Sequence, residues 1–206
     1  MKYTIIGGAP ELPDIEKIDK SSVIICADKG YDHCVSLNLK PHLVVGDLDS
    51  VANKIPSDIG LIVKDEQENT DTYLAVHYAK THGATKIDIF SCMGGRFDHT
   101  MGNVSILLFC IRNNIKARLI SKDNEAFIIS NQEISLKNTG RKYFSLFPIF
   151  CDTASGVSIK NAKYLLDNVV LSADHPIAVS NEFEENDAII SVKSGNLLIV
   201  LSSDIF

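Results

Sequence analysis

Two aspartates separated by one residue follow an apolar run in the segment Val44-Val45-Gly46-Asp47-Leu48-Asp49-Ser50. If the backbone is extended there, side chains two residues apart point the same way, so Asp47 and Asp49 share one side and Leu48 turns away. Two like charges about 4 Å apart repel by about 1 kcal/mol in water and about 4 kcal/mol at an effective dielectric constant of 20. The pair therefore indicates a bound cation. Oxygen-only ligands favour Mg²⁺, which completes its coordination with waters and substrate phosphates.

A second candidate site is Gly94-Gly95-Arg96-Phe97-Asp98-His99-Thr100, directly before a long apolar segment. The glycines permit close backbone approach, Arg96 offers a planar fork for phosphate oxygens, and the N-terminus of the following helix attracts anions. These features predict a phosphate-binding loop, in which His99 is a candidate acid, base or phosphate ligand. In the alternative interpretation, Asp98 or Thr100 caps the helix and Arg96 is its surface partner.

Two more polar clusters follow apolar runs. The first is Ala27-Asp28-Lys29-Gly30, in which Asp28 is expected to face a ligand and Gly30 to let the backbone approach that ligand. In the alternative interpretation, Asp28 caps the next helix. The second is Gln67-Glu68-Asn69-Thr70-Asp71-Thr72, in which Asp71 is in the first turn of a predicted helix. An acidic residue there is favourable because of the helix dipole, which by itself explains its presence. The functional interpretation is that the carboxylates of both clusters join the Asp47/Asp49 pair.

The elements around these clusters predict how they are brought together. Up to residue 121, short apolar runs alternate with helical patterns at 72–82 and 99–113, which is typical of a parallel sheet with crossover helices. The runs cover residues 3–7, 23–27, 43–45, 61–63, 87–91 and 117–120. Because parallel strands end at one edge, the four clusters are expected to meet there, as in a transferase that uses a Mg²⁺-nucleotide. The common phosphate-binding motifs GxxxxGK[ST] and GxGxxG are absent from the sequence.

The rest of the chain has a different pattern. Short β-like runs at close spacing predict an antiparallel sandwich or barrel. They cover residues 126–130, 134–136, 143–147, 156–160, 169–171, 177–179, 188–192 and 197–201. We therefore predict two domains, an α/β domain over residues 1–121 and an all-β domain over residues 122–206.

Composition narrows the class of protein. The 206 residues are 45% hydrophobic and 22% charged, as in an ordinary folded protein. A net charge of −6 without a Lys/Arg run argues against a nucleic-acid partner, and no apolar run is long enough to predict a membrane span or a signal peptide. Five scattered cysteines without a CxxC pair favour reduced thiols over zinc ligation. We therefore expect a cytoplasmic protein.

Five segments, taken in order along the chain, resemble the thiamine pyrophosphokinase family. They are Ala27–Gly30, Gly46–Ser50, Thr70–Asp71 with Ala75 one turn later, Gly94–His99 and Ser180–Glu182. The resemblance implies an α/β nucleotide-binding domain followed by a β-sandwich that binds thiamine and forms a homodimer. It also implies transfer of a pyrophosphoryl group from ATP to the hydroxyl of thiamine, which yields thiamine diphosphate and AMP.

The resemblance implies roles for individual residues. Mg²⁺ is expected at Asp47, Asp49 and Asp71, and catalysis is assigned to these three with Arg96 and Asp98. ATP contacts are expected at Asp28, Gly30, Gln67, Thr70, Gly95, Arg96 and His99. Thiamine is expected between two subunits, near Ser180 and Asn181. Independently of the resemblance, Tyr164 is a candidate for stacking on a flat cationic ligand; in the alternative interpretation it is a core residue. Two departures from the family pattern are Gln67-Glu68, where Lys-Asp is common, and Lys29, where a glycine is common.

Two other functions fit parts of the sequence. The order Asp47-Leu48-Asp49-Ser50-Val51 matches the Asp-x-Asp-x-Val pattern of aspartyl-phosphate hydrolases, whose first aspartate is a nucleophile, although that family places it after the first strand. A non-catalytic nucleotide sensor would use the same crevice without requiring all the carboxylates.

Overall fold

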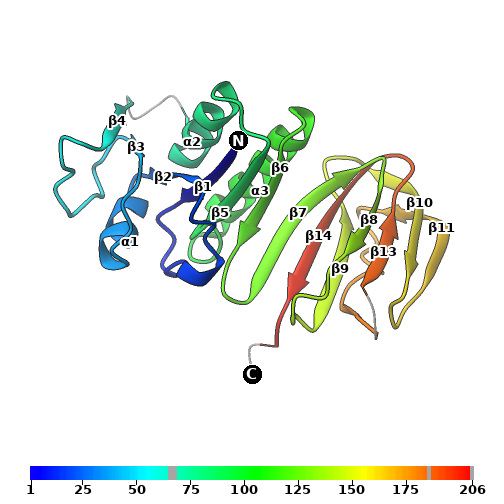
Figure 1. Ribbon diagram of the computed structural model, residues 1–206. Helices are drawn as coiled ribbons and strands as arrows, with labels where there is room; N and C mark the ends of the chain where they lie inside the picture. The colour runs from blue at the N-terminus through cyan, green and yellow to red at the C-terminus, as the bar shows by residue number, and fades with distance from the viewer. Residues whose placement is uncertain (65–68, 185–186, 205–206) are drawn as a thin grey trace. The chain divides into compact units, whose positions relative to one another are not determined.

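The computed structural model describes residues 1–64, 69–184 and 187–204, and the chain divides into an N-terminal unit, residues 1–122, and a C-terminal unit, residues 123–206. The division lies one residue after the boundary expected from the sequence. Figure 1 labels most helices and strands of the two units.

In the described part of the N-terminal unit, the sheet has six parallel strands in the order β6-β5-β1-β2-β3-β4. Each strand coincides with one of the six apolar runs. Both faces are covered near the centre of the sheet, which is why these strands lack the alternation of a half-exposed sheet. The bounds are β1 (Lys2–Ile6), β2 (Val23–Ala27), β3 (Leu43–Gly46), β4 (Gly60–Val63), β5 (Lys86–Phe90) and β6 (Lys116–Ile120).

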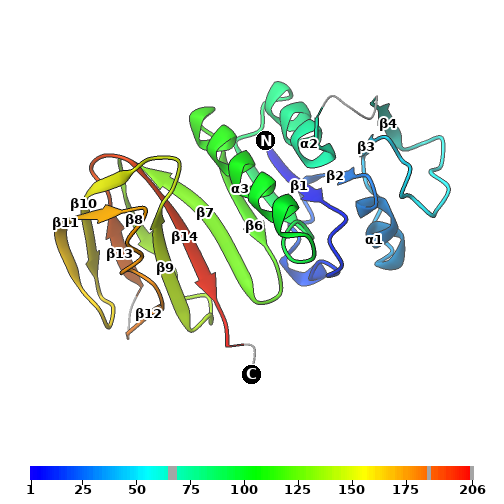
Figure 2. The ribbon, with the colours of Figure 1, turned by 180° about the vertical axis from the view of Figure 1, so that it is seen from behind.

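Among the described residues, three α-helices and a short 3₁₀ helix, η1 (Ile15–Lys17), accompany this sheet. Helices α2 (Asp71–Thr81) and α3 (Phe97–Arg112) begin one and two residues before the predicted helices. They contact each other and lie on the same face of the sheet (Figure 2). The sequence did not predict α1 (Gly30–Ser36), because seven residues are too few to establish a helical period.

Helix α1 packs into an apolar cluster on its own face of the sheet. Tyr31 and Cys34 of α1 join Ile6, Cys26 and Phe90, which are all nearly or fully buried. The Sγ atoms of Cys26 and Cys34 are 3.1 Å apart, and all five cysteines are free thiols, as expected from the sequence. Helix α1 is thereby fixed against β1 and β2.

The C-terminal unit contains two antiparallel sheets. Their strand orders are β12-β9-β14-β7 and β11-β10-β13-β8. The bounds are β7 (Asn124–Ser130), β8 (Glu133–Leu136), β9 (Tyr143–Pro148), β10 (Thr153–Lys160), β11 (Leu166–Ser172), β12 (Asn181–Glu182), β13 (Ala188–Ser191) and β14 (Asn196–Ser202).

The two sheets share one core. Alternate residues of β9 and β14, such as Leu146 and Ile199, are buried with Ile159 and Ile190 from the other sheet. The strand predicted at 177–179 was wrong. Only one backbone bond, from Leu146 N to Ala178 O, ties that segment to β9, and the left-handed backbone of Ser180 (φ 57°) turns the chain before β12 begins.

Candidate active site

The carboxyl ends of the parallel strands border a cavity of about 440 Å³. Its walls come from the segments that follow β1, β2 and β5 and from the first turns of α2 and α3. The predicted site residues among its lining are Asp28, Asp71, Gly95, Arg96 and His99. One sheet edge therefore gathers polar residues that lie up to 71 positions apart in the sequence, as parallel topology requires.

A carboxylate cluster lies at this edge. Asp28, Asp47 and Asp49 each offer an oxygen within 4.8 Å of the others. Asp28 Oδ2 accepts a hydrogen bond from Ser50 Oγ, while Asp28 Oδ1 is buried without a hydrogen-bond partner among the residues described. A buried carboxylate oxygen without a donor is costly unless a cation approaches it. The all-oxygen donor set and this oxygen fit Mg²⁺.

The backbone between the two neighbouring aspartates is not extended, contrary to the expectation from their spacing. Leu48 adopts a left-handed conformation with φ 67°, which costs a non-glycine residue about 1 kcal/mol or more. The Leu48 side chain turns away from the carboxylates, as predicted, and packs against the apolar cluster under α1. Asp49 N donates to Asp47 Oδ1 at 3.3 Å. A tight turn thus directs both carboxylates toward Asp28.

Asp71 lies beside this cluster but has a partner within the chain. Its Oδ1 is 3.1 Å from Lys64 Nζ, in an ion pair in which the lysine side chain is 9% exposed. Burial raises the pKa of Asp71, with Asp28 and Asp47 adding to the rise and Lys64 opposing it. The structure thus brings Asp28 within 4.8 Å of Asp47 and Asp49, whereas the family resemblance implies Asp71 as the third Mg²⁺ residue. Gln67 lies outside the described residues.

The glycine-arginine loop adopts the backbone that its sequence suggests. Gly94 and Gly95 have φ values of 85° and 70°, and α3 begins directly after Arg96. Arg96 Nε and Nη2 donate to the two oxygens of Asp98 at 3.1 and 2.6 Å, and this pairing lowers the pKa of Asp98 to about 2. Neither Asp98 nor Thr100 stands at the N-cap, which is Arg96 itself and has no side-chain cap.

Two residues predicted to contact ATP have a local structural role. A Cβ on Gly30 would lie 1.9 Å from Ile6 O, so glycine is needed there for the close approach of β1. Thr70 is the N-cap of α2, and its hydroxyl accepts a hydrogen bond from Tyr73 N at 3.3 Å. Neither residue lines the cavity.

Several cavity residues were not predicted. Buried Asn103 of α3 donates from Nδ2 to Cys92 O at 2.7 Å and so ties the helix to the segment after β5. Gly8 follows β1, and a Cβ there would lie 2.9 Å from Cβ of Lys29. The Gly7-Gly8 pair was a usable signal for Gly8, whereas Asn103 sits in an apolar helix with no local motif.

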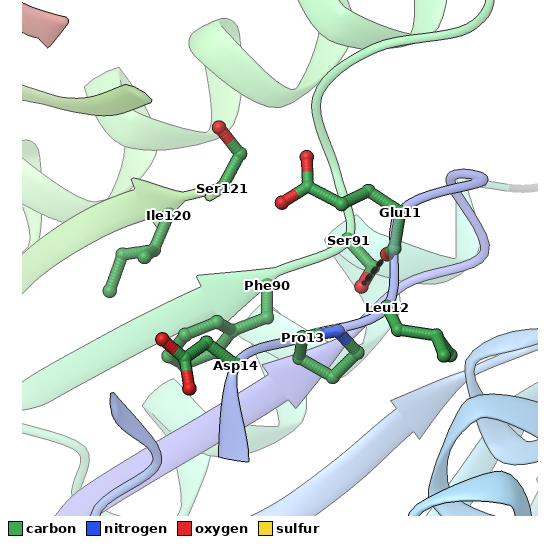
Figure 3. Close-up of a pocket in the computed structure, with 8 residues that line it drawn as sticks. All are labelled: Glu11, Leu12, Pro13, Asp14, Phe90, Ser91, Ile120 and Ser121. Carbon is green, nitrogen blue, oxygen red and sulfur yellow. Dashed lines mark hydrogen bonds between the residues drawn. The ribbon is translucent and has the colours of Figure 1, made fainter. Parts of the chain in front are cut away.

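A second, much smaller cavity lies between the ends of β5 and β6 and the 11–14 segment (Figure 3). Its volume is about 10 Å³, room for about one water molecule. Ser91 donates to Glu11 O at 2.7 Å along one wall. Phe90 and Ile120 form much of the rest, and none of the predicted site residues in the described part of the chain lines it.

The predicted thiamine residues come together in the C-terminal unit. Asn181 is buried and holds the Tyr164 backbone at both ends, accepting from Tyr164 N at 3.0 Å and donating to Tyr164 O at 2.7 Å. Ser180 N donates to Ser145 Oγ at 3.0 Å. The Tyr164 side chain is 58% exposed, so it belongs to the surface rather than to the core.

The fold and the site define a class: an α/β protein that presents clustered carboxylates and a glycine-arginine loop at the carboxyl edge of a parallel sheet. Two family models match the chain, the thiamin pyrophosphokinase catalytic domain over residues 16–119 and the thiamin pyrophosphokinase vitamin B1 binding domain over residues 131–197. The chain belongs to the thiamine pyrophosphokinase family, which is a family of enzymes.

Individual relatives agree with this assignment. The chain is 28% identical to the thiamine pyrophosphokinase of Bacillus subtilis, over 97% of this chain and 98% of that protein. It is 27% identical to thiamine pyrophosphokinase 3 of rice, over 88% and 78% of the two chains. The crystal structure of the Bacillus subtilis enzyme matches with a TM-score of 0.91 at 27% identity and covers both chains completely. Within the described residues, no helix combines the length and the apolar character needed to cross a membrane.

Proposed function

We propose that this protein transfers a pyrophosphoryl group from ATP to the hydroxyl of thiamine and releases thiamine diphosphate and AMP. Membership of the thiamine pyrophosphokinase family supports this reaction. The observation that carries it at the level of the site is the group formed by Asp28, Asp47 and Asp49, because Asp28 lines the cavity that Arg96 also lines. Carboxylates for a cation and a guanidinium for phosphates are the two elements that binding a polyphosphate requires.

Mg²⁺ would be held by Asp47 and Asp49, with Asp28 as the third carboxylate of the cluster and Asp71 beside it. When bound, the ion supplies positive charge to the phosphate oxygens. The buried Oδ1 of Asp28 and the proximity of the three carboxylates support this assignment. ATP phosphates would contact Arg96 and the backbone of Gly95, while His99 lies on the same cavity wall.

The reaction requires the thiamine hydroxyl oxygen to bond to the β-phosphorus as the bond from that phosphorus to the α,β-bridging oxygen breaks, with AMP as the leaving group. The chain contributes mainly by positioning the two substrates and by placing Arg96 next to the reacting phosphates. A carboxylate can accept the hydroxyl proton. Asp71 suits that role better than Asp98, because burial raises the pKa of Asp71 while Arg96 holds that of Asp98 at about 2.

For thiamine we propose a site that includes Ser180, Asn181 and Tyr164 and that is completed by a second subunit of a homodimer. Exposed apolar side chains next to these residues in the chain support an interface: Leu165 is 66% exposed and Ile177 57%. The exposed Tyr164 ring offers a face for a flat cation. We also propose a cytoplasmic location, which is supported by five free thiols.

The test is release of AMP from Mg²⁺-ATP by the purified protein, with and without thiamine, with EDTA as a control and the product identified by mass. AMP release that needs thiamine, stops with EDTA and accompanies thiamine diphosphate is expected. Turnover without thiamine would contradict the proposed acceptor, and ATP binding without turnover would favour the sensor. A phosphoryl group trapped on Asp47 would instead indicate an aspartyl-phosphate hydrolase.

A further inference from the structure

The connection between β3 and β4 carries Asp47 and Asp49. The residues that follow, 50–54, form hydrogen bonds with Asp28 and with helix α1. Ser50 Oγ donates to Asp28. Two residues later, Ala52 N donates to Asp32 Oδ2 at 2.9 Å, and Asn53 donates to Asp32 Oδ1 from its backbone N at 3.0 Å and from Nδ2 at 2.7 Å. The hydroxyl of Tyr31, the residue before Asp32, donates a hydrogen bond to Lys54 O at 3.3 Å.

Asp32 is the centre of these contacts. It is half-buried on α1, four residues after Asp28, and both of its carboxylate oxygens accept bonds from the connection. It belongs to neither the cavity lining nor the carboxylate cluster. The Asp32 side chain therefore does not contact a ligand in that cavity. Its three hydrogen bonds instead fix residues 52 and 53 against α1.

The cluster needs such a restraint for two reasons. Three carboxylates within 4.8 Å repel one another, so an unrestrained loop would move Asp47 and Asp49 away from Asp28 before a cation arrives. In addition, the turn that directs them contains Leu48 at φ 67°, a conformation that persists only where surrounding contacts enforce it. The side chains of Leu48 and Val51 pack against the apolar cluster under α1, and Asp32 bonds to the backbone of residues 52 and 53.

We propose that Asp32 is a positioning residue, which holds the segment 50–53 so that Asp47 and Asp49 stay beside Asp28 and the three can share one cation. This inference rests on the proposed function only in that it takes the cluster to be the cation site. Residues that orient metal ligands through hydrogen bonds change metal affinity or activity about 10- to 100-fold when they are removed.

The experiment measures Mn²⁺ binding to the nucleotide-free protein by electron paramagnetic resonance, together with unfolding in EDTA. Asp32→Ala is expected to raise the dissociation constant of Mn²⁺ about tenfold or more, while unfolding stays cooperative. Asp32→Asn keeps one acceptor oxygen and is expected to fall between wild type and Asp32→Ala. Asn53→Ala removes only the Nδ2 bond and gives a smaller shift in the same direction, which keeps the test valid if Asp32→Ala does not fold.

Asp58→Ala is the matched control, because Asp58 lies in the same connection but pairs with the exposed Lys40. It should bind Mn²⁺ as the wild type does. Hydrogen exchange in metal-free protein gives a second readout: the amides of residues 48–50 should exchange faster in Asp32→Ala but not in Asp58→Ala.

The outcomes separate this inference from the proposed function. Wild-type Mn²⁺ affinity in folded Asp32→Ala would overturn the positioning role. Lack of Mn²⁺ binding by the wild type would overturn both the cation site and this inference. Weakened Mn²⁺ binding in Asp32→Ala, in a protein that does not form thiamine diphosphate, would support the inference and refute the proposed reaction.

Discussion

The N-terminal unit contains two groups of buried or half-buried carboxylates that differ in their partners. Asp88, in the middle of the sheet on β5, accepts from Arg118 Nε at 2.8 Å and Nη2 at 2.9 Å and lies 3.1 Å from Lys86 Nζ. At the carboxyl edge, Asp28 and Asp47 form no ion pair with any described residue, and one oxygen of Asp28 has no donor there.

The two groups also differ in how they affect the folded state. Burial alone would raise the pKa of Asp88, but Arg118 and then Lys86 more than offset it, so its pKa lies below the ordinary value. At the edge, burial and neighbouring carboxylates raise the pKa of Asp71. The comparison indicates that Asp88 obtains its cations from the chain, as Asp71 does from Lys64, whereas Asp28 and Asp47 form no ion pair with the described residues and are where the proposed function places a cation from solution.

The largest effect is expected at the edge. Asp47→Asn keeps the oxygen that accepts from Asp49 N but removes one of three adjacent charges. We expect kcat/KM for thiamine diphosphate formation to fall about 10²- to 10³-fold, because charge next to the reacting phosphates is lost. The free energy of unfolding in EDTA, measured with urea, should be unchanged or higher. A large loss of stability together with the loss of activity would show that Asp47 is structural, like Asp88.

The second largest effect is expected at the centre of the sheet, where a substitution should reduce stability and leave activity nearly unchanged. Asp88→Asn leaves the Arg118 guanidinium facing a neutral amide, and we expect a loss of about 2–3 kcal/mol in the free energy of unfolding. Activity per folded molecule should change little. Asp19→Asn is the control, because it breaks an ion pair with Lys2 at the exposed end of β1 and should destabilise the protein much less. Equal losses in both variants would contradict the distinction between them.

The pH dependence of the free energy of unfolding tests the contribution of the Asp88 carboxylate. Because the pKa of Asp88 is lower in the folded than in the unfolded chain, the unfolded state binds its proton first as the pH falls. The stabilisation is complete above about pH 5, is lost as the pH falls through the ordinary aspartate value of about 4 toward the lower folded value, and is absent in Asp88→Asn. Chemical denaturation between pH 3 and 7 should therefore give a steeper acid slope for wild type than for the variant.

The smallest effect is expected from adding the cation itself. A ligand that binds only the folded state at ten times its dissociation constant stabilises by about 1.4 kcal/mol. Mg²⁺ should thus raise the Tm of the wild type and of Asp88→Asn, but not that of Asp47→Asn, when each is compared with the same protein in EDTA. An equal rise in all three would place the cation elsewhere.

Most of the architecture could be predicted from the sequence, because apolar runs and turn residues act locally. Each of the six runs before residue 121 became a parallel strand, and the order of the polar clusters along the chain led to the family. The failures occurred where local pattern is weak. Helix α1 is too short to show a period, and the apolar segment 177–179 lacks the neighbours that would complete its hydrogen bonds.

The sequence by itself determined the family, the α/β and all-β halves and the segments that meet at the edge of the sheet. Only the tertiary structure decided the individual contacts there: Asp28 close to Asp47 and Asp49, Asp71 paired with Lys64, and Asp32 bonded to the 52–53 backbone. The physical reason is that residue type and spacing fix what a segment can form, whereas the direction of a side chain depends on backbone dihedrals such as φ at Leu48. Those dihedrals are set by packing against residues that lie far away in the sequence.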